Sequence, residues 1–209
     1  MTITYPLSLP RSEFVRVTIF ENNGTSLNAS PFTGVESVQS FDAEFWEAEV
    51  EYPEFPYADA RAVLGWRSAL RGQLGTFLLP HPSQATSGGT AATVGGSPTV
   101  AGNGQSGSTV VIGFAPLNQV GYLVAGDIVQ IGPSARAHWH RILEDVDTDG
   151  SGGATLSIWP QLRPGVINGD AIRYTNPLCL FRMSSQLQEE EARPSLRTRI
   201  AFRCREALA

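Results

Sequence analysis

The 209-residue sequence contains no lysine, only two cysteines and only three histidines. All fifteen basic residues are therefore arginines, and with twenty acidic residues the net charge is -5, which disfavours a dedicated nucleic-acid-binding protein. Cys179 and Cys204 are too few for a disulfide framework, so we expect folding in a reducing compartment. No apolar run approaches the ~20 residues that span a bilayer, and the N-terminus has no signal-peptide pattern. We therefore expect no membrane partner.

The usual signatures of catalysis are also missing. There is no Gly-x-Ser-x-Gly motif, and neither cysteine stands beside a histidine or at the start of an expected helix. The glycine-rich stretch 102–107 lacks the lysine and the following helix of a phosphate-binding loop. We therefore expect neither enzymatic activity nor a cofactor.

The acidic stretch Asp145–Gly150 resembles the start of a calcium-binding loop, with carboxylates at alternate positions before a glycine. The twelfth position of such a loop requires a bidentate glutamate, and Leu156 stands there instead. No helical pattern flanks the stretch. We therefore predict an ordinary hairpin turn that does not bind calcium tightly.

The pair His138 and His140 lies on one face of an expected strand, as in some zinc sites, and Glu144 offers an oxygen nearby. A zinc site needs three or four converging ligands, and the only further histidine is His81. We therefore predict a hydrogen-bonded pair at a surface or interface, and no metal site.

What the sequence does contain is β-structure. It has 42% hydrophobic residues, 21 glycines and 14 prolines, a composition typical of a turn-rich β protein. Strands are expected over 14–20, 35–52, 76–79 and 196–204, and a helix over 57–73. Ala62, Val63, Trp66, Leu70 and Leu74 are predicted to form the buried face of that helix.

Two local details refine this pattern. Asn23-Gly24 is a strong hairpin signal, so we expect a turn there. In the strand 35–52 the apolar residues change faces between Phe45 and Trp46, which requires a β-bulge or a sharp twist. In the last strand one face carries Leu196, Thr198, Ile200, Phe202 and Cys204 and the other carries four arginines, which predicts one buried face.

The middle of the chain has a different character. Residues 83–108 are rich in Gly, Ser, Thr and Ala without any charge, so they form either a flexible linker or a partly ordered edge of a domain. From 109 to 176, short β-branched runs alternate with turns, which is typical of a small antiparallel barrel or sandwich. Gly126-Asp127 and Gly169-Asp170 each precede a strand there.

We therefore expect a mainly β protein with one principal α-helix. A discontinuous, β-sandwich-like core domain would comprise residues 1–82 and 178–209. A small antiparallel β-barrel or sandwich, residues 83–177, would be inserted into it. Because few elements cross these boundaries, replacing about residues 84–176 by a short linker is expected to leave a folded core.

Several of these motifs resemble one family. They are the Gly-Asp strand starts, the hairpin tip at Asp149–Gly153, Ile158-Trp-Pro-Gln-Leu-Arg-Pro164, Asn176-Pro177 before Phe181-Arg182, the glycine-rich stretch 95–107 and the ending Ile200–Leu208. Together they are similar to the distal-tail proteins of long-tailed bacteriophages, over roughly residues 40–209. These are turn and strand motifs, so they indicate a fold more directly than a function.

The resemblance implies a structural virion protein, assembled in the host cytoplasm and located in the phage tail. Such proteins form a ring, hexameric by the same resemblance, at the distal end of the tail tube. The implied partners are further copies of itself, the tail tube protein and the tail tip or hub protein. No specific nucleic-acid binding is implied, although DNA passes through such rings.

Two charged rows suggest how copies meet. The rows comprise Glu47, Glu49 and Glu51 in one expected strand and Arg197, Arg199, Arg203 and Arg205 in another. If the rows share one sheet, they form cross-strand pairs; if they are solvated, they do nothing specific. If they lie on opposite flanks, they suit a head-to-tail contact of the kind that closes rings, and the resemblance favours this arrangement.

A rival function is a carbohydrate- or receptor-binding module. In that case Trp139 and Trp159 of the inserted domain would form a platform on which a sugar ring stacks. Tryptophans in such strands more often belong to a core, so the platform is the less favoured alternative.

Overall fold

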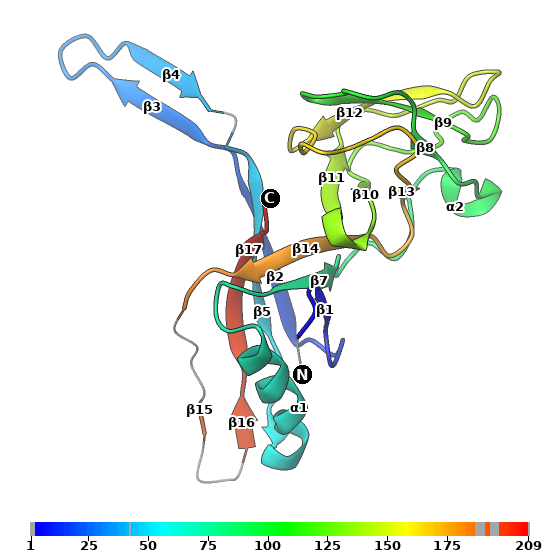
Figure 1. Cartoon of the computed structure of the whole chain (residues 1–209). Helices are drawn as coiled ribbons and strands as arrows, with labels where there is room; N and C mark the ends of the chain where they lie inside the picture. Colours follow the sequence, from blue (N-terminus) through cyan, green and yellow to red (C-terminus); the bar gives the residue numbers. More distant parts are fainter. Residues whose placement is uncertain (1–2, 42, 187–190, 193–196, 209) are drawn as a thin grey trace.

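Two six-stranded β-sheets lie side by side, and a hairpin projects beyond them; a small three-stranded sheet and two α-helices complete the described fold (Figure 1). The computed structural model describes residues 3–41, 43–186, 191–192 and 197–208. The first sheet, which we call the core sheet, packs against helix α1, and the second sheet curls into a barrel at the upper right of Figure 1. The fold is mainly β with one principal helix, as the sequence predicts.

Strands from both ends of the chain build the core sheet. Its order is β1 (Leu7–Ser8), β7 (Thr76–Pro80), β14 (Leu178–Met183), β17 (Ala201–Glu206), β5 (Phe45–Glu51) and β2 (Arg16–Asn22). All neighbours are antiparallel except β1 and β7. Because side chains alternate along a strand, Trp46, Ala48 and Val50 of β5 share the buried face, as their spacing predicts.

Helix α1 (Tyr57–Ala69) packs on the buried face of the core sheet. Its buried residues recur every three or four positions, including the residue that follows its last turn: Ala60, Val63, Trp66 and Leu70. The predicted face is wrong at two positions, because Ala62 and Leu74 are exposed. The helix ends five residues before Leu74, and the buried stripe passes through Ala60 instead of Ala62.

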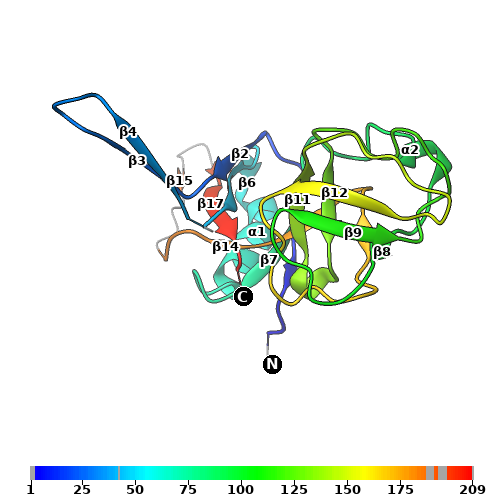
Figure 2. The same ribbon diagram turned by 90° about the horizontal axis from the view of Figure 1, so that it is seen from above.

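The barrel is a separate sheet with its own apolar interior. Its order is β13 (Ile172–Arg173), β10 (Ile128–Ile131), β11 (His138–Ile142), β12 (Ala154–Trp159), β9 (Thr109–Gly113) and β8 (Thr99–Val100). A bridge between Thr99 and Ala171 links the two edge strands, so the sheet nearly closes on itself (Figure 2). Val110, Leu123 and Ile142 are among the residues that fill it.

The segment that leads into the barrel is ordered, which decides against a flexible linker. It includes the short helix α2 (Ala91–Val94) and β8. The buried carboxylate of Asp127 holds it, accepting hydrogen bonds from Ser87 Oγ (2.5 Å) and Gly88 N (2.8 Å). The aspartate of the Gly126-Asp127 motif therefore fixes the position of this segment through hydrogen bonds. A 3-10 turn, η1 (Ser134–Arg136), joins β10 to β11.

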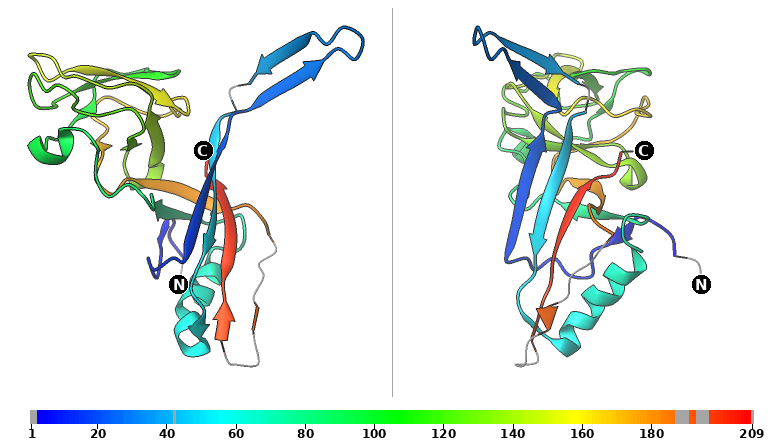
Figure 3. Two further views of the ribbon diagram at one scale, coloured as in Figure 1. Left: turned by 180° about the vertical axis from the view of Figure 1, so that it is seen from behind. Right: turned by 90° about the vertical axis from the view of Figure 1, so that its left-hand side faces the viewer.

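A hairpin projects beyond both sheets (Figure 3). We call residues 25–40 the arm; it contains β3 (Thr25–Ala29) and β4 (Glu36–Ser40), paired with each other. The predicted turn at Asn23-Gly24 is wrong, because the chain reverses at residues 30–35 instead. Gly24, with φ of 54°, bends the ribbon where the arm leaves β2, and its carbonyl accepts a hydrogen bond from Phe41 N (2.9 Å). The single strand expected over 35–52 is divided, because β4 ends at Ser40 and β5 begins at Phe45; the predicted change of face between Phe45 and Trp46 falls inside β5 and not at this break.

The last predicted strand is divided in two. Its first half, β16 (Arg197–Arg199), pairs with β15 (Glu191–Ala192) and β6 (Phe55–Pro56), and its second half is β17. The predicted buried face is confirmed at Thr198, Ile200, Phe202 and Cys204, whereas Leu196 lies outside the described residues. Within the described part of the chain, neither helix has the length and apolarity needed to cross a membrane.

Candidate functional site: the domain junction and the arm

A buried carboxylate lies where the core sheet meets the barrel. Glu206, at the end of β17, is 2% exposed. Arg163 binds both of its oxygens, with Nε at 2.9 Å and Nη2 at 2.5 Å, and His138 Nδ1 lies 2.7 Å from Oε1. Trp46 N donates a fourth hydrogen bond at 3.2 Å. Arg163 and His138 belong to the inserted domain, whereas Glu206 belongs to the core domain. We call Glu206, Arg163 and His138 the junction cluster, because they link the two domains through one buried carboxylate.

The carboxylate is held in its charged form. Burial alone raises the pKa of Glu206, but the hydrogen bonds from His138 and Arg163 and the charge of Arg163 outweigh it, so the pKa lies below its ordinary value. A buried ion pair contributes little net stability compared with an apolar replacement, but removing one partner is costly. The cluster therefore fixes the domains in one geometry.

Three tryptophans pack around this charge. Trp46 of the core sheet donates from Nε1 to the carbonyl of Trp139 (2.9 Å), and its ring meets that of Trp159 edge to face with centroids 4.6 Å apart. Trp139 is fully buried and donates from Nε1 to Pro177 O (3.0 Å). Trp139 and Trp159 therefore pack against Trp46 inside the junction, the core position that the sequence favoured over the sugar-stacking alternative.

All three histidines of the chain lie at this junction. His140 is buried, with Nδ1 2.8 Å from Pro160 O and with no partner for Nε2; burial lowers its pKa to about 4. His81 packs edge-on against Trp139 at 4.9 Å, and burial lowers its pKa to about 4 as well. His138 and His140 thus have different partners, and Glu144 lies on an exposed loop.

One group of potential metal ligands exists among the described residues. It comprises His138, Cys179 and Glu206, whose ligand atoms all lie within 4.8 Å of one another. The guanidinium of Arg163 already binds both oxygens of Glu206, in the place a cation would take. Burial also raises the pKa of Cys179 well above its ordinary value, which keeps the thiol protonated. The arrangement around Glu206 is therefore that of a buried ion pair with Arg163 and not that of a metal site.

Each aspartate of the stretch Asp145–Gly150 accepts a hydrogen bond from a backbone amide at a different place in the loops. Asp145 Oδ1 accepts from Ala125 N (2.9 Å), Asp147 Oδ1 from Gly121 N (2.7 Å), and Asp149 Oδ1 from Gly153 N (2.8 Å). The three carboxylates therefore do not converge on one point. Leu156, at the twelfth position, is buried in β12.

The two charged rows lie side by side in one copy. In the pairing of β5 with β17, Glu49 stands opposite Arg203 and Glu47 opposite Arg205. Arg203 reaches Glu49 at 3.6 Å, and Arg199 reaches Glu51 at 2.6 Å. The predicted position of the rows on opposite flanks is therefore wrong, since antiparallel pairing makes them neighbours. Arg197 contacts the carbonyl of Glu54 instead of a carboxylate in these rows.

One face of the arm carries an apolar cross-strand pair beside Thr25, Ala29, Glu36 and Ser40, and its other face is polar; we call the first the apolar face. The cross-strand pair Leu27 and Val38 lies on the apolar face, 59% and 67% exposed, and Phe32 at the tip is 95% exposed. The opposite face carries only polar side chains in its two strands: Ser26, Asn28, Ser37 and Gln39. Neither hydrophobic cluster includes any residue of the arm.

Comparison with known proteins assigns no family. No protein-family model and no curated protein matches the sequence. The junction cluster and the exposed face of the arm were both missed by sequence reasoning. A signal for Glu206 existed, because the alternation of Phe202 and Cys204 places residue 206 on the same buried face. No comparable signal marks Arg163 and His138, which are 43 and 68 residues away.

Proposed function

We infer that this protein is a structural subunit of a phage tail, assembling into a ring at the distal end of the tail tube. The resemblance of its turn and strand motifs to distal-tail proteins suggests this role, together with the tail tube and the tail tip or hub as neighbours. The observation that supports assembly most directly is the arm.

An isolated two-stranded hairpin is marginally stable in water, and it needs a third strand or a packing partner. The arm has no such partner among the residues that the structure describes, yet it presents the contiguous apolar side chains of Leu27 and Val38. Exposed apolar surface of this kind marks contacts with other proteins. A second copy supplies the missing surface at every repeat if the contact is head to tail, and such contacts close into rings.

The test replaces the apolar face of the arm without altering the domains. Leu27→Ser with Val38→Ser should convert a ring of the wild-type chain into folded monomers, measured by light scattering and by negative-stain electron microscopy. The matched control is Asn28→Ser with Gln39→Ser on the polar face, which should assemble as the wild type does. Near-UV circular dichroism should be the same for all three proteins, because the arm touches neither core.

Two results would contradict parts of this proposal. If the Leu27 and Val38 variant still forms rings, the arm is not the assembly contact. If the wild-type chain stays monomeric as its concentration is raised, the ring role itself fails for the isolated protein. The runner-up role in carbohydrate binding has lost the residues on which it rested, since Trp139 and Trp159 belong to the junction.

A further inference from the structure

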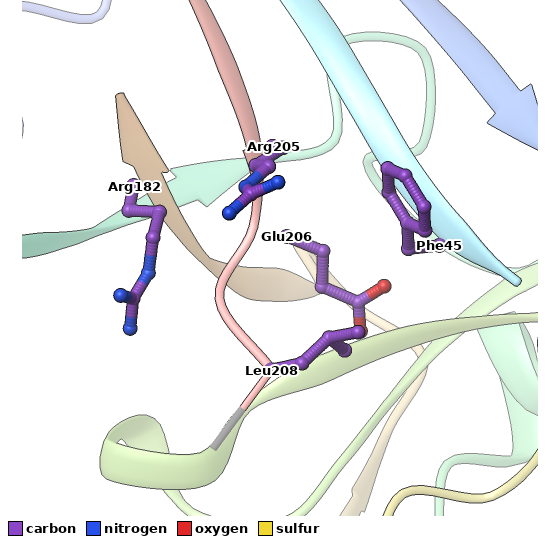
Figure 4. A pocket seen from close by; sticks show the side chains of 5 residues that line it. All are labelled: Phe45, Arg182, Arg205, Glu206 and Leu208. Atoms are coloured by element: carbon purple, nitrogen blue, oxygen red, sulfur yellow. The ribbon is translucent and has the colours of Figure 1, made fainter. Parts of the chain in front are cut away.

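A small pocket opens between the ends of β5, β14 and β17 (Figure 4). Its volume is about 160 Å³, and its lining residues are Phe45, Arg182, Arg205, Glu206 and Leu208. Sites for drug-sized molecules occupy roughly 300–1,000 Å³, so this pocket has room for a single side chain or chain end. Figure 4 shows Arg182 and Arg205 on neighbouring strands, with Phe45 on the other side of β17 and Leu208 below.

Within the described part of the chain, no carboxylate neutralises the two arginines of the pocket. Arg182 and Arg205 stand directly opposite each other in the pairing of β14 with β17, an arrangement in which like charges destabilise a sheet. Neither forms a hydrogen bond or an ion pair with any described residue, and Nε of Arg182 is buried without a partner. Farther along, Arg203 pairs with Glu49 and Arg199 with Glu51. Arg199 in β16 and Arg203 in β17 are thus paired with carboxylates of β5, whereas the two arginines at the pocket are not paired with any described carboxylate.

Nearby carboxylates do not remove this positive charge. Glu206 lines the pocket, but its oxygens are bound by Arg163 and His138 on the side of the barrel. Glu47 stands opposite Arg205 in the sheet, yet no ion pair joins them within 4.0 Å. The rest of the pocket lining is the already bound carboxylate of Glu206 and the apolar side chains of Phe45 and Leu208.

We propose that this pocket binds a carboxylate that a polypeptide partner carries next to an apolar side chain. Guanidinium groups bind carboxylates through paired, charge-assisted hydrogen bonds. Phe45 and Leu208 offer contact to the neighbouring apolar group, which an inorganic anion lacks. Two sources share this chemistry, an acidic side chain within a segment and the carboxylate at a chain terminus. The proposal does not depend on the ring.

The experiment uses the full chain and small probes that separate these sources. Acetyl-leucine represents a terminal carboxylate, acetyl-Leu-Glu-amide a side-chain carboxylate, and acetyl-Leu-Gln-amide is the neutral control. Inorganic phosphate is the fourth probe. By isothermal titration, at least one carboxylate probe should bind saturably and at least tenfold more tightly than the neutral control. Whichever carboxylate binds more tightly identifies the source.

Variants locate the site. Arg182→Gln and Arg205→Gln should each weaken the carboxylate probe at least tenfold, whereas Arg61→Gln on the exposed side of α1 should leave its affinity unchanged. Phosphate binding as tightly as the best carboxylate would overturn the role of the apolar wall. Equal binding of the neutral probe, or no saturable binding of any probe, would overturn the site.

A second measurement needs no ligand. Because Arg182 faces a like charge, Arg182→Gln should raise the melting temperature of the free protein, by roughly 1–3 °C. Arg61→Gln should not change it. A lower melting temperature for Arg182→Gln would mean that the protein's own groups already satisfy this guanidinium, which contradicts the proposal.

Discussion

Glu206 is a single buried carboxylate that accepts hydrogen bonds from both domains. Glu206→Gln should lower the free energy of unfolding by about 3 kcal/mol or more, since Arg163 is left as a buried charge without a counter-ion. Urea unfolding at pH 7 measures the loss. Glu47→Gln, which removes a carboxylate that has no ion pair within 4.0 Å, is the control and should change stability little.

The companion variant separates charge balance from packing. Replacing both partners, Glu206→Leu with Arg163→Leu, should recover much of the loss, because a well-packed apolar pair substitutes for a buried ion pair at little cost. If Glu206→Gln proves as stable as the wild type, the carboxylate is not the counter-ion that the junction requires.

His140 should make the protein sensitive to acid. Burial lowers its pKa to about 4, so below its unfolded pKa of about 6.5 the unfolded chain binds a proton that the folded protein excludes. Its contribution is therefore complete above pH 6.5 and is lost as the pH falls towards 4. Between pH 7.5 and 4.5 this loss amounts to about 2–3 kcal/mol for one such histidine.

The measurement compares His140→Asn with the wild type. The amide of asparagine reproduces the hydrogen bond that Nδ1 donates to Pro160 O, without a group that titrates in this range. Urea unfolding at pH 7.5 and 4.5 should show a smaller drop for the variant than for the wild type. Glu206 acts in the same direction at lower pH, because its lowered pKa makes its contribution vanish as the carboxylate is protonated. Parallel drops in the two proteins would show that His140 accepts a proton in the folded state.

At the scale of elements, the paired strands β5 and β17 hold the charged rows together. Arg203→Glu places a like charge opposite Glu49 and should cost roughly 0.2–1 kcal/mol. Adding Glu49→Arg should restore most of the loss, because the pair is only reversed. Unfolding free energies of the two single variants and the double variant measure this coupling. Additive effects would show that the two side chains do not interact.

Several elements were predictable because local signals agreed with tertiary structure. The alternation in 198–204 and the spacing of Trp46, Ala48 and Val50 correctly gave buried faces, since both depend on burial alone. The turn at Asn23-Gly24 failed because the hairpin signal is local, whereas the ribbon there is a continuous pair that only bends. The faces of the charged rows were correct, but their relative position required knowing which strands pair.

The candidate site was less accessible to sequence reasoning than the fold. Glu206, Arg163 and His138 come from three segments, and only the closing of the barrel against the core sheet brings them together. The apolar face of the arm involves Leu27 and Val38, which become neighbours only once the turn is known to lie at 30–35. Both features depend on long-range pairing.

At the scale of the whole molecule, the two domains share part of one core. Ile128 and Trp139 of the barrel belong to the hydrophobic cluster of the core sheet. We therefore expect that replacing residues 84–176 by a short Gly/Ser linker leaves an unstable core, contrary to the expectation from sequence boundaries. The loss should exceed about 3 kcal/mol, because Glu206 loses Arg163 and the Trp46 ring loses its cover.

The same deletion carrying Glu206→Leu should be more stable than the plain deletion, since it removes the unpaired charge. Near-UV circular dichroism and urea unfolding of the two deletion proteins measure the difference. A plain deletion protein as stable as the full chain would mean that the barrel adds nothing to the core.

The distance along the chain between the partners in the core sheet has a consequence for synthesis. Trp46 and Glu206 are 160 residues apart, so β5 leaves the ribosome long before β17 exists to pair with it. At roughly 5–20 residues per second, that interval lasts about 8–30 seconds. During it the nascent chain carries the apolar side chains of β5 without those of β17, and the last barrel strand, β13, is synthesised before β14 and β17. The barrel is therefore the first of the two six-stranded sheets whose strands are all available during translation, and the core sheet is completed only when β17 has been made.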